Sequence, residues 1–366
     1  MTRPPSPWPR REFVRRTLAV GAGVAAQNLA AACGRSSSDQ PVAADGDLGP
    51  IEPELNLYLW SDYLADNTIP NFEKEFGVKV TLDTYESNEE MIAKLLAGAS
   101  GYDLILPTSN LFAALFANDL VAPLNRRYLT NWGNVAPIFV DPAWDPGNAH
   151  SVPWAWGTTG IAYRKDQIKH PPDSWSVFFD PALRGKMTML DDLRDVIGTF
   201  LKYRGRSLNS IVPAELTQAK ADAVAAKANL KAYVSAPVKA QLIAGDVWLA
   251  QLWSGDAAQA MAEQPELAYV IPKEGSMIFT DGLAIPKTAR HRRAAHEFMN
   301  YVLRPEIAAA IADKTGYGTP NQAALPLTRA KVPYPTAEEL ARLEYQTDLG
   351  AAAQDWDRLW TEIKSA

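Results

Sequence analysis

Strand-like and helix-like segments alternate along residues 54–118, and this alternation limits the fold more than any other feature of the sequence. The strand-like segments are short runs rich in branched and aromatic residues, whereas the helix-like segments carry apolar residues at three- and four-residue spacing. They follow one another at 54–60, 68–76, 78–85, 89–97, 101–106 and 109–118. Ser109 is the expected N-cap of the last helix. Strands and helices that alternate at these lengths predict a parallel sheet covered by helices.

Similar segments continue along the rest of the chain with less regularity. We expect a strand at 151–165, which has a Gly/Thr interruption and could carry the chain into a second domain. Further elements are expected as strands at 186–190, 247–253 and 278–286, a helix at 215–232 and a mostly helical tail at 336–364. Residues 51–366 are numerous enough for two domains, each with its own core.

The first residues of the chain have the three parts of a secretory signal. Arg10 and Arg11 belong to a basic stretch, an uncharged apolar stretch follows at 17–32, and small residues precede Cys33. The paired arginines resemble a twin-arginine export signal, and the apolar stretch is too short to span a bilayer. We therefore predict a signal peptide over 1–32 and an extracytoplasmic protein of a bacterium.

Cys33, the only cysteine of the chain, is the expected site of a lipid anchor. A lone cysteine forms no intramolecular disulfide and is a liability in an oxidising compartment, so a lipid-bearing residue explains it better than an incidental thiol. One departure is that Leu29 lies four residues before Cys33, whereas lipobox sequences usually carry Leu three residues before the cysteine. Residues 33–50 have almost no bulky apolar residues and are expected to form a flexible tether.

The charge of the chain argues against a nucleic-acid partner. The formal net charge is −6, and because residues 1–32 contribute five Arg and one Glu, residues 33 onward carry about −10. Binding to phosphates needs a basic face. An acidic exterior is compatible with a cationic ligand, although many soluble proteins are this acidic.

Acidic and aromatic residues recur together at or near the ends of the predicted strands, where ligands bind in sheets of this kind. The residues concerned are Trp60, Tyr63, Asp192, Asp195, Trp253, Asp256, Phe279, Asp281 and Tyr317. Carboxylates accept charge-assisted hydrogen bonds from an organic ammonium, and ring faces add cation–π attraction. A diamine needs such groups at both of its ends. The pattern therefore predicts a site for an organic amine.

Each of these residues also has an ordinary structural explanation. Asp192 could cap a helix that starts at the next residue, which would make Asp195 a first-turn acid. Trp60 and Trp253 could be core aromatics, and Asp281 could belong to a turn. It is the repeated pairing of acids with aromatics that favours a binding site.

Eight segments of the body resemble the periplasmic spermidine/putrescine-binding proteins of polyamine ABC importers. In order along the chain they are LYLWSDY at 57–63, TYESNEEMIAKL at 84–95, YDLILPTS at 102–109, SVPWAWGTTGIAYRKD at 151–166, LRGKMTMLDDLRDV at 183–196, LWSGDAA at 252–258, IFTDGLAIP at 278–286 and TGYGTPN at 315–321. The resemblance implies a two-lobed α/β fold, the type II periplasmic binding protein fold, with a mixed, mostly parallel sheet in each lobe and the ligand between the lobes. Under it, lobe 1 comprises 51–158 plus 281–325, and lobe 2 comprises 159–280 plus 326–366.

The resemblance also implies a function and a set of ligand contacts. It implies a protein without enzyme activity, cofactor or metal that captures putrescine and/or spermidine, delivers it to a membrane permease and works as a monomer. The residues that match the family's ligand contacts are Trp60, Ser61, Tyr63, Thr108, Asp192, Ser235, Trp253, Asp281, Tyr317 and, on the tail helix, Gln346. Asp195 stands where a Glu is usual, and Asn110 stands where the spermidine type has Tyr. Asp62, Asp256 and Phe279 are more similar to the putrescine branch, whereas Asp192 and Gln346 are more similar to the spermidine branch, so the length of the ligand stays open.

Two other functions compete with polyamine binding. One is a binding protein for another amine or small organic solute, and the other is an extracytoplasmic hydrolase that uses two acids. An anionic ligand is disfavoured because Arg194 is the only basic residue among the clustered acids. Ferric ion is disfavoured because the four His show no ligand spacing, and the sequence has no nucleophile elbow, metal motif or phosphate loop.

Overall fold

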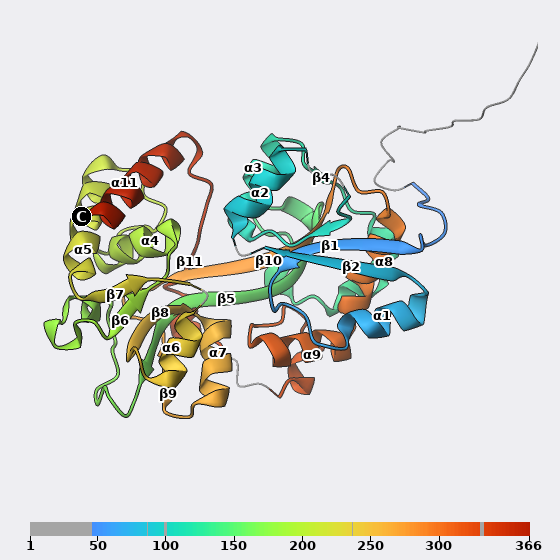
Figure 1. Ribbon diagram of the computed structural model, residues 1–366. Coiled ribbons are helices and arrows are strands. Elements are labelled where there is room, and N and C mark those ends of the chain that lie inside the picture. The colour runs from blue at the N-terminus through green and yellow to red at the C-terminus, as the bar shows by residue number, and fades with distance from the viewer. Residues whose placement is uncertain (1–45, 86, 99–100, 236, 330–332) are drawn as a thin grey trace, which may run out of the picture. The chain divides into compact units, whose positions relative to one another are not determined.

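The computed structural model describes residues 46–85, 87–98, 101–235, 237–329 and 333–366 (Figure 1). The predicted signal peptide over 1–32, Cys33 and most of the predicted tether lie outside these residues. Within the described part of the chain, no helix is both long and apolar enough to cross a membrane.

The described residues form an α/β structure. The strands are β1 Glu54–Trp60, β2 Lys79–Tyr85, β3 Leu104–Ile105, β4 Val121–Ala122, β5 Ser151–Arg164, β6 Met187–Met189, β7 Leu230–Tyr233, β8 Leu249–Trp253, β9 Leu267–Val270, β10 Met277–Pro286 and β11 Glu344–Tyr345. The helices are α1 Thr68–Phe76, α2 Asn88–Leu96, α3 Phe112–Ala117, α4 Leu193–Tyr203, α5 Pro213–Lys227, α6 Val238–Ala244, α7 Ser254–Glu263, α8 Arg292–Val302, α9 Pro305–Thr315, α10 Ala337–Leu340 and α11 Ala353–Ser365.

The strands form a mixed sheet whose central members are the two long strands β5 and β10 (Figure 1). The order along the sheet is β2-β1-β3-β10-β5-β8-β6-β7, with β4 and β11 beside β10 and β9 beside β5. As predicted, β1 pairs in parallel with β2 and β3. In the second parallel group, β6 pairs with β8 and with β7, a strand that the sequence did not predict. The long strands pair antiparallel with each other, so they link the two parallel groups into one structure.

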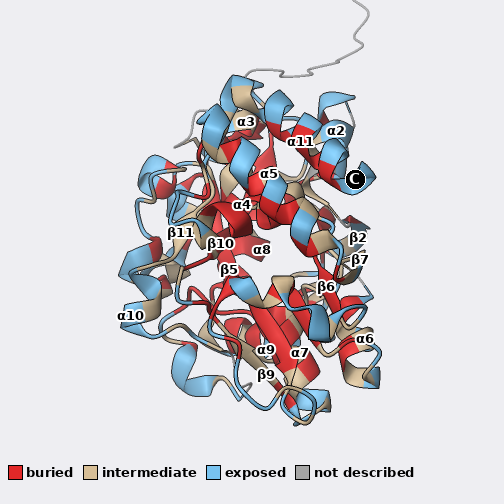
Figure 2. Ribbon diagram, turned by 90° about the vertical axis from the view of Figure 1, so that its left-hand side faces the viewer, coloured by how far each residue is buried: buried red, intermediate tan, exposed pale blue. Residues whose placement is uncertain are grey.

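The strand β5 contributes to both large hydrophobic cores. Its first half supplies Val152 and Trp156 to a core that includes Phe72 and Phe298, whereas its second half supplies Ile161 to a core that includes Trp356. Figure 2 shows β5 and β10 as buried, while long helices such as α5 and α7 have buried and exposed sides. A fully buried large apolar side chain contributes about 1.5–3 kcal/mol to the stability of the fold. Because β5 supplies such side chains to both cores, both cores depend on this strand.

The sequence predicted several element boundaries wrongly. The expected helix at 215–232 is α5, which ends at Lys227, because the chain then turns at Asn229 to pair Leu230 with Met187. The tail contains the short strand β11, which pairs with the start of β10 and separates α10 from α11. Ser109 is not an N-cap: it lies inside a short 3₁₀ segment, Ser109–Leu111, whose N-cap is Thr108.

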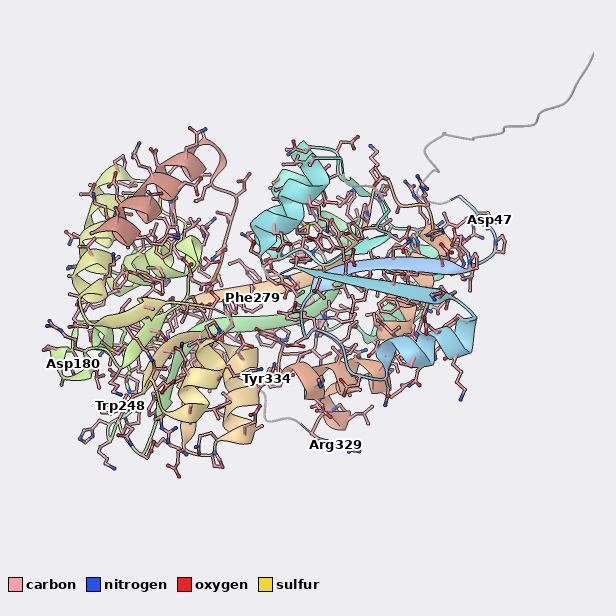
Figure 3. The ribbon with its side chains drawn as sticks, viewed as in Figure 1. Asp47, Asp180, Trp248, Phe279, Arg329 and Tyr334 are labelled. Atoms are coloured by element: carbon pink, nitrogen blue, oxygen red, sulfur yellow. The ribbon has the colours of Figure 1, made fainter. Side chains whose placement is uncertain are left out.

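The described end of the predicted tether contacts the folded body. The Asn125 amide donates to the Gly46 carbonyl oxygen over 2.6 Å, and the Tyr128 hydroxyl donates to the Asp47 carboxylate over 2.9 Å. The Leu48 amide in turn donates to the Tyr128 hydroxyl over 3.0 Å. Asp47 is labelled in Figure 3.

The end of α1 gives a test of how the sequence stops a helix. Gly77 has φ +68°, a left-handed conformation that strains any residue with a Cβ, and its amide closes the helix on the Glu73 carbonyl. We expect Gly77→Ala to lower the free energy of unfolding by about 1 kcal/mol in urea denaturation. Gly133→Ala is the matched control, because Gly133 has no positive φ and nothing lies within 4 Å of an added Cβ. Equal stability of the two variants would contradict the role given to Gly77.

Candidate ligand-binding site

One face of the β5–β10 ladder carries predicted site residues in a row. Asp281 pairs with Ala155 and Phe279 pairs with Gly157 on β5. Thr159, two residues further along β5, pairs with Trp253 on β8. Alternate residues of a strand face the same side. Ala155 and Thr159 therefore mark two ends of one row, about 13 Å apart at about 3.3 Å per residue. Phe279, which pairs with Gly157 between those ends, is labelled in Figure 3 where β10 lies beside β5.

The Asp281 carboxylate forms one end of the row. It is 1% exposed and accepts hydrogen bonds from the Thr108 hydroxyl over 2.7 Å and from the Tyr63 hydroxyl over 3.1 Å. Both donors are neutral, and among the described residues no Lys or Arg forms an ion pair with this carboxylate. Burial raises the pKa of Asp281 to about 7, although the two hydroxyl bonds oppose the shift. Asp281 is thus a strand residue beside a β-bulge, and the turn position considered from the sequence is wrong.

Aromatic rings form a wall next to Asp281. The Tyr317 ring lies 5.2 Å from Tyr63 and 5.9 Å from Phe279 between ring centroids. Two glycines make room for these rings: a Cβ on Gly255 would lie 2.4 Å from the Tyr317 ring, and one on Gly157 would lie 2.8 Å from Phe279. Glycine at these positions lets the rings pack directly against the backbone, so the wall is part of how the chain folds here.

A second pair of acids lies at the other end of the row, at the start of α4. Asp192 is the N-cap, and its carboxylate accepts hydrogen bonds from the Arg194 and Asp195 amides over 2.8 and 2.9 Å. The Asp195 carboxylate, 4% exposed, accepts from the Thr159 hydroxyl over 2.6 Å and from the Trp253 indole over 3.1 Å. Burial, and then the charge of Asp192, raises the pKa of Asp195. The capping role anticipated for Asp192 is confirmed, and it places Asp195 facing β5.

Asp256 extends the acidic surroundings from the first turn of α7. Burial raises its pKa to about 6; nearby Lys239 opposes the shift and Asp62 adds to it. Asp62 itself is exposed and has φ +56°, in the loop that follows β1. These two acids lie on segments far apart in the sequence, yet Asp62 is close enough for its charge to act on Asp256.

The remaining predicted residues lie at the borders of this region. The Trp60 ring packs on Tyr85 at 4.7 Å between centroids, and Ser61 follows it at the end of β1. The Ser235 hydroxyl accepts a hydrogen bond from the Asp191 amide over 3.2 Å, next to the α4 cap. Gln346 was expected on a helix, which is wrong: it follows β11 in a segment without regular structure.

Sequence reasoning missed two residues that fix the site acids and their donors. Thr159 holds Asp195 in place, and the Asn88 amide donates to the Thr108 hydroxyl over 3.1 Å. Thr159 lies in the Gly/Thr stretch of β5. Because alternate side chains of a strand face the same side, its distance of two residues from Gly157 could have indicated that it faces the site. Asn88 has no such signal, because its contact depends on how α2 packs beside β3.

Comparisons with known proteins identify the family of this chain. Residues 67–340 match the family described as bacterial extracellular solute-binding protein. The putrescine/cadaverine-binding protein of Pseudomonas aeruginosa is 35% identical over 330 residues, which are 85% of this chain and 93% of that protein. The chain belongs to the bacterial extracellular solute-binding protein family, and this membership places it outside the bacterial cytoplasm.

Solved structures extend the similarity to the fold. The spermidine/putrescine ABC transporter substrate-binding protein PotD of Streptococcus pneumoniae is similar with a TM-score of 0.77 and 30% identity, over 86% of this chain and 99% of that one. The TpPotD lipoprotein of Treponema pallidum is similar with a TM-score of 0.79 and 30% identity, over 85% and 99%. The predicted fold class, the type II periplasmic binding protein fold with mixed sheets flanked by helices, is confirmed.

The raised pKa of Asp281 links the stability of the ligand-free protein to pH. An Asp in an unfolded chain has a pKa of about 3.9, so between about pH 4 and about pH 7 the folded protein holds a proton that the unfolded chain has lost. The free energy of unfolding therefore falls as pH rises through this window. We expect the free energy of unfolding of Asp281→Asn to fall less over this window. The difference in free energy of unfolding between the variant and the wild type should therefore change in favour of the variant by about 1 kcal/mol or more between about pH 5 and about pH 8.

Urea denaturation at the two pH values measures this gain. The control is Asp173→Asn, which removes an exposed carboxylate paired with Lys273. A gain in the control as large as in Asp281→Asn would contradict the assignment to Asp281.

Proposed function

We propose that the protein captures a polyamine, putrescine and/or spermidine, outside the cytoplasm and delivers it to an ABC importer. The single observation that carries this proposal is the Asp281 carboxylate, which is buried, bonded only by neutral hydroxyls and lined by aromatic rings. A buried carboxylate without a cation is unfavourable, and an organic ammonium would supply both the charge and a cation–π partner.

The row of groups on β5 and β10 supports a ligand with more than one cationic nitrogen. In the proposal, Asp281 binds one ammonium, with Tyr63 and Thr108 orienting its carboxylate. In an amine long enough to reach them, the acids near Thr159 bind a further nitrogen, and the aromatic wall covers the methylenes between the two ends. The further proposed contacts are Trp60, Ser61, Asp62, Asp192, Asp195, Ser235, Trp253, Asp256, Phe279, Tyr317 and Gln346.

The proposed delivery step rests on the similar proteins. Their names describe binding of putrescine, cadaverine or spermidine, and one is the substrate-binding protein of an ABC transporter. We propose that this chain serves such an importer as a monomer, with lobes at 51–158 plus 281–325 and at 159–280 plus 326–366. In this arrangement β5 and β10 connect the lobes, and closure of the lobes around the ligand prepares it for transfer.

Isothermal titration calorimetry of residues 46–366 tests the ligand class. We expect binding of putrescine, spermidine or both at micromolar concentration or tighter, and a loss of about tenfold or more in Asp281→Asn, because a charge-assisted hydrogen bond contributes about 1.5–3 kcal/mol. Cadaverine, agmatine and spermine complete the panel, and Asp173→Asn is the control. Absence of binding below millimolar concentration for every polyamine would overturn the proposal, and selective binding of agmatine would redirect it to another amine.

We also propose export by the twin-arginine route and lipid attachment at Cys33, supported by the basic and apolar stretches before it. A similar protein of Treponema pallidum is named a lipoprotein. In cells that express the full chain, we expect the wild type in the membrane fraction and Cys33→Ser in the soluble extracytoplasmic fraction. Ser36→Ala is the control, since Ser36 follows the anchor within the tether. An unchanged membrane fraction in Cys33→Ser would show that the thiol carries no anchor.

A further inference from the structure

The backbone on both sides of Gln346 is held by a single side chain. The Asn209 amide nitrogen donates to the Tyr345 carbonyl oxygen over 2.8 Å, and the Asn209 amide oxygen accepts from the Thr347 amide over 2.8 Å. Arg194 donates to the Thr347 carbonyl oxygen over 3.0 Å. Three hydrogen bonds thus fix the residues that flank Gln346.

The amide of Asn209 uses its full hydrogen-bonding capacity in this network. Besides the two bonds to the Gln346 segment, its oxygen accepts from Arg194 over 2.8 Å and its nitrogen donates to Glu344 over 3.2 Å. An asparagine side chain offers two lone pairs and two N–H groups, so no other residue type of this size satisfies all four partners. Because all four hydrogen-bonding positions of this amide are used, the network holds the segment around Gln346 in one conformation.

Gln346 itself is half-buried, and within the described part of the chain its amide makes no hydrogen bond. Its position is well defined, because Tyr345 pairs with Ile278 on β10 and its hydroxyl lies 3.0 Å from the Thr280 hydroxyl. The parallel register of β11 and β10 ends at that pair, and the next residues of the two segments are Gln346 and Phe279, which belongs to the row of site residues. The segment therefore places an unpaired amide beside the row.

Arg194 connects this network to the acids of the site. It lies between Asp192 and Asp195 in the first turn of α4, and its guanidinium lies 4.9 Å from the centre of the Trp356 ring. The Gln346 segment is consequently tied to the end of the row where Asp195 lies, away from Asp281.

We propose that Asn209 is a positioning residue that, together with Arg194, presents the Gln346 amide to the part of the ligand nearest Asp195. This inference rests on the proposed polyamine function and adds to it a determinant of ligand length. A longer amine that reaches Gln346 gains a hydrogen bond from the ordered amide, whereas a shorter diamine held by the rest of the row does not. The effect of Asn209 is therefore larger for spermidine than for putrescine.

A double-mutant cycle in calorimetry tests this inference with Asn209→Ala, Gln346→Ala and the double variant. We expect Asn209→Ala to weaken spermidine binding by about fivefold to tenfold, the range of one hydrogen bond, and putrescine binding by less than about twofold. In the Gln346→Ala background, Asn209→Ala should cause no further loss, because it acts through Gln346. A cooperative urea transition with the slope of the wild type shows that the variants are folded.

Asn134→Ala is the matched control, since it removes one side-chain bond to the Leu303 carbonyl in another part of the molecule. Equal losses for the two amines, additive losses in the double variant, or a wild type that binds putrescine but not spermidine would overturn the inference. A wild type that binds neither amine would instead overturn the proposed function.

Discussion

The antiparallel ladder between β5 and β10 is the contact on which both the fold and the candidate site depend. It joins the two parallel groups of strands, and it contributes residues both to the cores and to the row of site residues. The register shifts at Asp281, where Trp154 on β5 is the extra residue of a bulge between paired Ala155 and Pro153. Bulges re-aim a side chain locally. At this point the neighbouring Pro107 and Thr108 bond to β10, so the end of β3 reaches the Asp281 carboxylate.

The fold holds its site acids in surroundings that disfavour their charge. Asp281 has two hydroxyl donors, and Asp195 has one hydroxyl and one indole donor, but neither receives a Lys or Arg hydrogen bond among the described residues. The fixed dipoles orient each carboxylate without neutralising it. A cationic ligand pairs with these carboxylates and relieves the unfavourable burial of their charge. A neutral or anionic ligand cannot do so, and the site therefore selects cations.

Local sequence patterns were sufficient for the parts of the fold that depend on short-range order. The alternation along 54–118 predicted β1, α1, β2 and α2 within a residue or two, and the runs of acids and rings indicated the chemistry of the site. Patterns failed where pairing with a distant segment decides the structure, as at β7 and β11. For the same reason Thr159, Asn88 and Asn209 were missed: each is an ordinary polar residue whose partner lies elsewhere in the chain.

The ladder also restricts how a site of this kind can select its ligand. Ala155 and Thr159 lie on one continuous strand, so the distance between the backbone positions at the two ends of the row is fixed by the rise of that strand. Replacing Asp281 by a neutral residue changes the charge at one end but not this backbone spacing. Selection by length must therefore involve groups that are not on β5 or β10, and Asp195 on α4, Asp256 on α7 and Gln346 after β11 are such groups. Their positions depend on packing and side-chain hydrogen bonds, which single substitutions can alter while the ladder and the cores stay intact.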